Sequence, residues 1–232
     1  MLFYKGTLPR EVELARQAEM AREGKVPEGC RLAGEHLVLS GDGKTLVGCL
    51  PGAGQVVNLP EELEEIGPYA MAGSDVACLR FPLGLKWIGE GAFMNCRKLA
   101  WMEPVDEWAW KEGLDSGQWQ RRMPPRLEEL GPRAFAGCSS LKTAELPGSL
   151  EKVGEEAFSQ SGVTSVDLGN GVKEVGPRAF AGCKLDRVAF PRSLSLVGEE
   201  AFARGELGET FGAPASLERW LGGRQTTPWR RR

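Results

Sequence analysis

A serine and a lysine with the spacing Ser-x-x-Lys, Ser139 and Lys142, could form the nucleophile and base of a hydrolase. That chemistry requires the amine beside the hydroxyl on a helix, and it comes with companion motifs. Here the pair straddles the turn into a predicted strand, and the companion motifs are absent. The lone histidine, His36, has no positioned Ser or Cys that would complete a triad. The sequence therefore predicts no catalytic residues, and a hydrolase is the disfavoured alternative.

The triplet Gly43-Lys44-Thr45 is similar to the end of a phosphate-binding loop, whose backbone N–H groups surround a nucleotide. Such a loop also needs a glycine five residues before Gly43, where this chain has Val38, and a helix directly after it. Strand-forming residues follow instead. The stretch 36–50 therefore predicts a β-hairpin, and we expect no nucleotide or other cofactor.

Three of the six cysteines, Cys96, Cys138 and Cys183, recur at the same place in Ala-Phe-x-x-Cys or its variants. Other copies of this motif carry a serine or a glycine there, which indicates a small-residue position at a tight inward turn. We therefore predict free buried thiols rather than disulfides. No Cys-x-x-Cys spacing occurs, so we expect no metal site. Reduced cysteines favour a cytoplasmic location.

The elements that carry these residues repeat with a period of about 22 residues, most clearly over 141–191. Each copy predicts a strand that ends at Pro or Gly, an extended segment that ends at Gly, and one helical turn containing Ala-Phe. The glycine would permit the bend of the chain. Six glycines mark the phase of the copies: Gly67, Gly89, Gly131, Gly154, Gly176 and Gly198.

A single copy cannot bury its apolar face, so stacked copies must cover one another. Stacking places equivalent side chains in columns. One such column is predicted to be an internal, mostly aromatic spine: Met71, Phe93, Phe135, Phe158, Phe180 and Phe202. These residues are interpreted as core and not as a cofactor site.

The pattern Leu-Pro-x-x-Leu-x-x-Ile-Gly-x-x-Ala-Phe-x-x-Cys-x-x-Leu is carried by residues 81–99, 146–163 and 172–185. It resembles the BspA-like (Treponema pallidum type) leucine-rich repeat, and residues 36–60 resemble the hairpin-like entry that often precedes such repeats. The resemblance covers roughly residues 34–212. It implies a curved solenoid and a binding role, in several members adhesion to host or matrix proteins. It implies no catalytic residues.

We therefore expect an α/β repeat fold: a right-handed leucine-rich-repeat solenoid with parallel strands on the concave face. Short helical turns or extended segments form the convex side, and both ends are capped. Residues 1–33 are expected to form a helical cap, or alternatively a partner-binding helix. Residues 34–212 form the solenoid, with an entry hairpin over 34–60, about six repeats and a Trp-rich insertion over 103–122. Residues 213–232 form a C-terminal cap and a basic tail.

The outward residues of the strands are the candidate partner-binding site, because repeat proteins bind on this concave surface. Three insertion tryptophans either join the site or fold back onto the solenoid. The candidate partner-binding residues are Arg80, Trp101, Glu103, Trp108, Trp110, Trp119, Thr143, Glu145, Ser165, Asp167 and Arg187.

A formal net charge of −3 does not indicate nucleic-acid binding, and no apolar run is long enough for a membrane span. The first residues lack the apolar core of a signal peptide. We therefore expect a cytoplasmic, monomeric scaffold that binds a protein partner without catalysis. The alternative is a secreted or cell-surface adhesion module, if the chain lacks its native start, that binds a matrix protein or a glycan.

Overall fold

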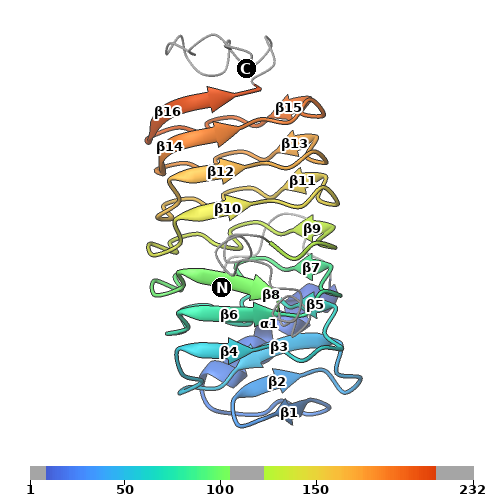
Figure 1. Ribbon diagram of the computed structural model, residues 1–232. Helices are drawn as coiled ribbons and strands as arrows, with labels where there is room; N and C mark the ends of the chain where they lie inside the picture. The colour runs from blue at the N-terminus through green and yellow to red at the C-terminus, as the bar shows by residue number, and fades with distance from the viewer. Residues whose placement is uncertain (1–8, 105–122, 213–232) are drawn as a thin grey trace, which may run out of the picture.

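Stacked coils build the molecule, as the ribbon of the computed structural model shows (Figure 1). The structure describes residues 9–104 and 123–212. About seven turns follow one another along one axis, with parallel strands lying above one another. The predicted stacked-repeat solenoid with parallel strands is therefore confirmed.

One wall of the solenoid is a continuous nine-stranded sheet of order β1-β2-β3-β5-β7-β9-β11-β13-β15. Its first three strands are antiparallel and all later pairs are parallel. The antiparallel pair β2–β3 is the hairpin that the sequence predicted over 36–50. The strands are β1 (Arg31–Ala33), β2 (Leu37–Leu39), β3 (Thr45–Cys49), β5 (Glu65–Ile66), β7 (Trp87–Ile88), β9 (Glu129–Leu130), β11 (Lys152–Val153), β13 (Glu174–Val175) and β15 (Leu196–Val197).

The second wall is divided into a three-stranded sheet, β4-β6-β8, and a four-stranded sheet, β10-β12-β14-β16, all parallel. Buried apolar side chains alternate with more exposed side chains along these strands, so one set points into the core. The strands are β4 (Val56–Asn58), β6 (Cys78–Phe81), β8 (Trp101–Pro104), β10 (Thr143–Glu145), β12 (Ser165–Asp167), β14 (Lys184–Ala189) and β16 (Glu206–Phe211).

The aromatic column predicted from the repeat is present in the core. Successive phenylalanine rings from Phe93 to Phe202 are stacked, with centroids 5.1, 5.4, 5.2 and 5.5 Å apart and interplanar angles of 9° or less. Met71 is buried in the equivalent position of the preceding coil. The inner rings, Phe135, Phe158 and Phe180, therefore contact the coils on both sides, which couples the stability of neighbouring coils.

The phase-marking glycines serve a different purpose from the one that the sequence suggested. Their φ angles are not positive, so a bend does not require glycine there. A Cβ atom at Gly154 would lie 2.6 Å from the carbonyl carbon of Gly131, and one at Gly198 would lie 2.3 Å from the backbone nitrogen of Pro177. Glycine is needed because the backbones of adjacent coils approach too closely for a side chain.

The segment after each glycine is not the helical turn that was expected. Two residues per coil, four positions apart, adopt left-handed conformations, such as Arg133 (φ 55°) and Gly137 (φ 73°). Alternate N–H groups then donate to the next coil and not only within the segment: Phe135 donates to the carbonyl of Ala157 at 2.7 Å. A helical turn would direct these N–H groups along its own axis, so the stacked ladder determines the conformation.

Helix α1 (Pro9–Arg22) lies on the side of the first coils (Figure 1). Ala15, Ala18 and Ala21 have no exposed surface and pack on β3 and on residues of the next coils, including Tyr69. A Cβ atom at Gly48 would lie 2.5 Å from that of Ala21, so this contact requires small residues on both sides. The sequence placed the helix over the open end of the solenoid, but β1 forms the terminal edge of the sheet instead.

Candidate functional site

The candidate binding surface consists of the outward side chains of β4, β6, β8, β10, β12, β14 and β16, here called the strand face. Register places these side chains in two columns. The first column reads Val56, Cys78 and Trp101 in the three-stranded sheet, then Thr143, Ser165, Arg187 and Glu209 in the four-stranded sheet. The second column reads Asn58, Arg80 and Glu103, then Glu145, Asp167, Ala189 and Phe211.

The three-stranded sheet presents an apolar stripe made of Val56, Cys78 and Trp101. The side chains at its two ends are strongly exposed, 55% for Val56 and 50% for Trp101. Cys78 lies between them and is half-buried. Three register-paired residues of this kind expose apolar surface that water solvates poorly, and tryptophan is enriched at binding hot spots.

A fixed ion pair lies beside this stripe. The Arg80 guanidinium nitrogen Nε donates to Glu103 Oε1 at 2.5 Å, and the Cys78 thiol approaches the same oxygen at 3.8 Å. Burial and the Glu103 carboxylate raise the pKa of the Cys78 thiol above its ordinary value. Cys78 is therefore mainly a thiol at neutral pH and contributes apolar surface, not charge.

The four-stranded sheet presents a polar surface in the same two columns. Arg187 is exposed, and its guanidinium lies 4.8 Å from the ring centre of Phe211, a cation–π contact within the chain. The carboxylate of exposed Asp167 accepts a hydrogen bond from the N–H of Gly169 at 2.9 Å. Thr143 and Ser165 are half-buried neighbours in the first column. This half offers hydrogen bonds and charges but no apolar stripe.

The strand face is interrupted between its two sheets. β8 and β10 belong to different sheets, and residues 105–122 separate β8 from Met123. Met123 donates its N–H to the carbonyl of Glu145 at 3.0 Å, so the chain re-enters the wall in the coil before β10. Glu103, which the sequence placed both among the outward strand residues and at the start of the insertion, is part of β8. The predicted binding residues Trp108, Trp110 and Trp119 lie outside the described residues.

A groove of about 380 Å³ lies beside this interruption, on the side of the four-stranded sheet. Its apolar lining includes Phe81, Leu83 and Met123, and Leu83 is 42% exposed. The carboxylates of Glu145 and Asp167 come from adjacent strands at its rim. The groove therefore continues the strand face with an apolar wall and an acidic edge.

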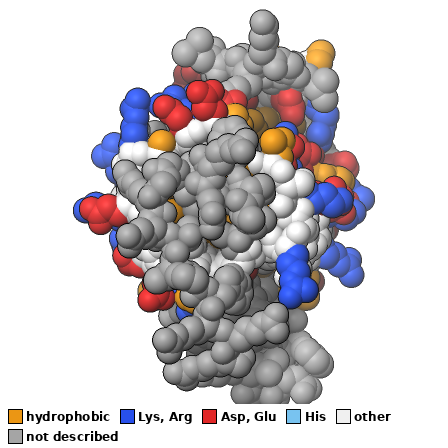
Figure 2. Space-filling view, turned by 90° about the horizontal axis from the view of Figure 1, so that it is seen from above, with side chains coloured by type: hydrophobic (Ala, Val, Ile, Leu, Met, Phe, Trp, Pro, Cys, Tyr) orange, Lys and Arg blue, Asp and Glu red, His pale blue; other side chains and the backbone are white. Residues whose placement is uncertain are grey.

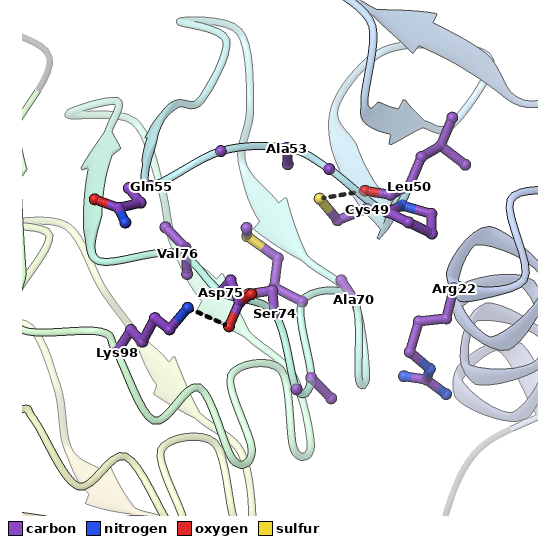
Figure 3. Close-up of a pocket in the computed structure, with 16 residues that line it drawn as sticks. Arg22, Cys49, Leu50, Ala53, Gln55, Ala70, Ser74, Asp75, Val76 and Lys98 are labelled. Atoms are coloured by element: carbon purple, nitrogen blue, oxygen red, sulfur yellow. Dashed lines mark hydrogen bonds and ion pairs between the residues drawn. The ribbon is translucent and has the colours of Figure 1, made fainter.

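A second groove, of about 530 Å³, lies at the N-terminal end of the core column (Figure 3). The loop 50–55 and the turn segment 70–76 form its two sides, and Arg22 of α1 lies at one end. The Cys49 thiol lines it, and burial raises the pKa of this thiol to about 11. At the other end, Lys98 Nζ pairs with Asp75 Oδ1 at 3.0 Å.

The residues with the spacing of catalytic groups do not form reactive pairs. Lys142 Nζ donates to the backbone carbonyl of Ser139 at 3.3 Å, while the Ser139 hydroxyl donates to the carbonyl of Arg97. Gly43 and Lys44 lie in the β2–β3 turn, where Lys44 donates its backbone N–H to Asp42. Over residues 9–104 and 123–212, no cluster of three or more His, Cys, Asp or Glu side chains could hold a metal ion.

The buried cysteines have the structural position that the sequence predicted. The thiols of Cys96, Cys138 and Cys183 are buried and each donates to a carbonyl of the preceding coil, at 3.0, 3.1 and 3.1 Å. All six cysteines are free thiols in the structure. Burial raises the pKa of each of these three thiols, which keeps them protonated and unreactive.

The comparison with known families agrees with this geometry. Residues 54–104 and 120–219 match the model of the BspA type leucine rich repeat region, in six copies. The chain belongs to the BspA-type leucine-rich repeat family. In the described part of this BspA-type repeat protein, no helix is long and apolar enough to cross a membrane. No protein of curated function matches it in sequence.

Solved structures of similar fold come from several bacteria. The T. pallidum leucine rich repeat protein is 24% identical with a TM-score of 0.54, over 85% of this chain and 94% of that one. A Bacteroides ovatus leucine-rich repeat protein is 22% identical (TM-score 0.53; 82% and 53% covered). A leucine rich cell surface protein from Faecalibacterium prausnitzii is 19% identical (TM-score 0.56; 81% and 55% covered). The BspA-type chain thus spans about half the length of the last two relatives.

Sequence reasoning missed both ends of the strand face of this BspA-type protein. Val56 and Asn58 were assigned to the entry hairpin, although Val56-Val57-Asn58-Leu59-Pro60 has the same pattern as the later strands. Glu209 and Phe211 lie in β16, inside the predicted solenoid over 34–212, but after Leu207 the repeat pattern weakens and they were not named as candidates. Their signal was weak because β16 lacks the apolar residues of the consensus, yet it pairs with β14 over most of its length.

Proposed function

We propose that this protein is a non-enzymatic scaffold that binds a protein partner through its strand face, together with the Trp-rich insertion that interrupts it. The family is one of repeat proteins, and the described residues present a broad strand face on two parallel sheets. The stripe of Val56, Cys78 and Trp101 is the centre of the proposed interface, and the four-stranded sheet is its polar extension.

The observation that carries this proposal is the register of the stripe. Strand pairing places Val56 and Trp101 on either side of Cys78, so their exposed apolar surfaces are continuous across three coils. The Arg80–Glu103 pair fixes two charged side chains next to it, which limits the entropy that a partner would lose in ordering them. An apolar centre with a polar rim is the usual anatomy of a protein interface.

The proposal is tested by affinity capture from the source cells with the purified full chain as bait. Captured proteins are compared between the wild type, Trp101→Ser, and a triple variant with serine at Trp108, Trp110 and Trp119. Truncation of a hot-spot tryptophan typically weakens binding by about 2 kcal/mol or more, roughly thirtyfold. We expect Trp101→Ser to lose the partner and the triple variant to reduce its recovery.

Leu196→Ser provides the matched control for this experiment. Leu196 is 52% exposed, but it lies on the nine-stranded sheet, on the opposite wall of the solenoid. Circular dichroism must show all variants to be folded. Equal capture by the wild type and Trp101→Ser, or an equal loss with Leu196→Ser, would contradict binding at the stripe.

A cytoplasmic location stays our prediction, supported by the free thiols. The printed description of the F. prausnitzii relative supports the alternative, a cell-surface location. Half-buried Cys78 makes the two distinguishable. A membrane-impermeant maleimide applied to intact cells should leave Cys78 unlabelled if the protein is inside, whereas labelling of Cys78 before lysis would place the strand face outside.

A further inference from the structure

The first turn segment of the solenoid has an unpaired hydrogen-bonding edge. In every later coil the equivalent carbonyls accept N–H groups from the coil before: those of Ala92 and Met94 accept from Met71 and Gly73, at 2.9 and 2.8 Å. The carbonyls of Ala70 and Ala72 have this phase, but no described residue donates to them. They face the side on which a preceding turn segment would lie.

That preceding segment is missing because the first coil takes a shorter path. The chain passes from Leu46 to Val56 with two residues fewer than from Ile66 to Cys78, the register-equivalent positions of the next coil. The loop 50–55 crosses in place of a turn segment. The groove of about 530 Å³ in Figure 3 occupies the remaining space.

The lining of this groove suits an apolar side chain. Cys49, Met71 and Val76 belong to the apolar core, and Met71 ends the column of stacked rings. An aromatic or aliphatic side chain above Met71 would extend that column by one member. A polypeptide segment can satisfy both features at once, because its backbone N–H groups pair with the unpaired carbonyls while one of its side chains fills the apolar recess.

The shape of this end restricts the occupant to a single segment. Strands β3, β2 and β1 extend the nine-stranded sheet beyond β5 by three strands, about 14 Å at the usual strand spacing. A complete coil of a second solenoid would collide with this extension. Ala70 has no exposed surface, so a segment that reaches its carbonyl displaces the loop, in which Gly52 and Gly54 have φ angles of 88° and 81°.

We propose that this groove is a second binding site, which takes a short segment of a partner protein that pairs as one turn segment pairs with the next. The segment donates two alternate backbone N–H groups to the carbonyls of Ala70 and Ala72 and places one bulky apolar side chain above Met71. It carries no proline at the two donating positions. This site is separate from the strand face, so it can bind independently of the proposed interface there.

The test uses a synthetic peptide with the sequence of residues 131–138, Gly-Pro-Arg-Ala-Phe-Ala-Gly-Ser, with serine in place of Cys138. In the solenoid this segment donates from Phe135 and Gly137 to the next coil, at 2.7 and 2.9 Å, as the proposal requires of the occupant. The peptide is titrated into the isotope-labelled full chain and followed by amide NMR shifts. We expect saturable shifts at Ala53 and over residues 70–76.

Two control peptides distinguish backbone hydrogen bonding in the groove from nonspecific binding of the peptide. One carries N-methyl groups on the Phe and the second Gly, and the other has alanine in place of Phe. Loss of two backbone hydrogen bonds should weaken binding about tenfold or more. Equal binding of the N-methylated peptide, or no shift with the unmethylated peptide up to about 1 mM, overturns the proposal. Trp101→Ser should bind the peptide as the wild type does, and a loss there would place the peptide on the strand face and overturn the proposal.

Discussion

The three-stranded and four-stranded parts of the second wall are built from the same coil but present opposite surfaces. Their inward residues are interchangeable apolar side chains, such as Leu79 in one sheet and Val166 in the other, both about 1% exposed. Their outward residues in one column are apolar at β4–β8 and polar at β10–β16. Packing in the core therefore restricts only the inward side chains of each strand, whereas the outward side chains can differ between the two sheets.

The middle of the core column and its N-terminal end also differ. Phe158 stacks between two rings whose centroids lie 5.4 and 5.2 Å away, whereas Met71 borders the N-terminal groove. The middle coils are packed on both sides, and the first complete coil is packed fully on only one. Local stability should therefore fall toward the N-terminal groove, where binding needs a displaceable loop. The predictions below test this difference.

The largest effect is expected in the core column. Phe158→Ala removes a ring between two others and should lower the free energy of unfolding by about 3–5 kcal/mol. Met71→Ala should cost less, about 2–3 kcal/mol, because Met71 already borders a groove. Chemical denaturation followed by circular dichroism measures both. Equal losses would show that the end coil is packed as tightly as the middle.

Alanine at the phase-marking glycines should have the next largest effect. Gly154→Ala places a methyl group against the Gly131 backbone and should cost about 2–3 kcal/mol. In Gly67→Ala the nearest atom to the new methyl group is the Leu46 carbonyl oxygen, at 3.0 Å, and the other contacts are at ordinary distances, so the change should cost about 1 kcal/mol. Gly148→Ala is the control, because nothing lies within 4 Å of its Cβ position. A large loss at Gly148 would disprove the close-approach explanation.

Thiol reactivity should separate the strand face from the core. Cys78 is half-buried, whereas Cys138 is fully buried with a raised pKa, so of these two thiols Cys78 alone should react with a soluble maleimide in the native state. The rate at Cys78 should rise with pH, because its pKa is also raised and the thiolate is the reactive form. Mass spectrometry of the modified peptides measures both sites. Native-state labelling of Cys138 would contradict its burial.

The smallest effect concerns a carboxylate near α1. Burial raises the pKa of Glu90 above its ordinary value, and the hydroxyl of Tyr69 donates to it. The folded protein is therefore stabilised when Glu90 is protonated. This stabilisation is complete below the unfolded-state pKa of Glu90 and is lost as pH rises through its folded-state pKa. Glu90→Gln should therefore raise the melting temperature slightly at pH 7 and less at pH 4. A larger gain at pH 4 would contradict this assignment.

Much of the candidate site was predictable because strand residues alternate strictly. Arg80, Trp101 and Glu103 were assigned outward from the pleat, and the structure places them together on one sheet. Arg187 was also assigned outward, but its contact with Phe211 depended on a strand that the decaying repeat did not reveal. Val56 was missed because the sequence grouped it with the hairpin. The N-terminal groove could not be predicted, since it results from a shortened connection between two coils.

The sequence by itself determined the period, the inward column of Phe93 to Phe202 and the stacked solenoid, because equivalent residues of a stacked repeat must pack on one another. Tertiary structure decided the conformation after each glycine, where pairing with the next coil overrides the local preference for a helical turn. It also decided the position of α1. The small side chains of Ala15, Ala18 and Ala21 can pack on any flat stretch of backbone, so the sequence does not specify which one they contact. These features depend on contacts between coils, and a local pattern of residues does not contain them.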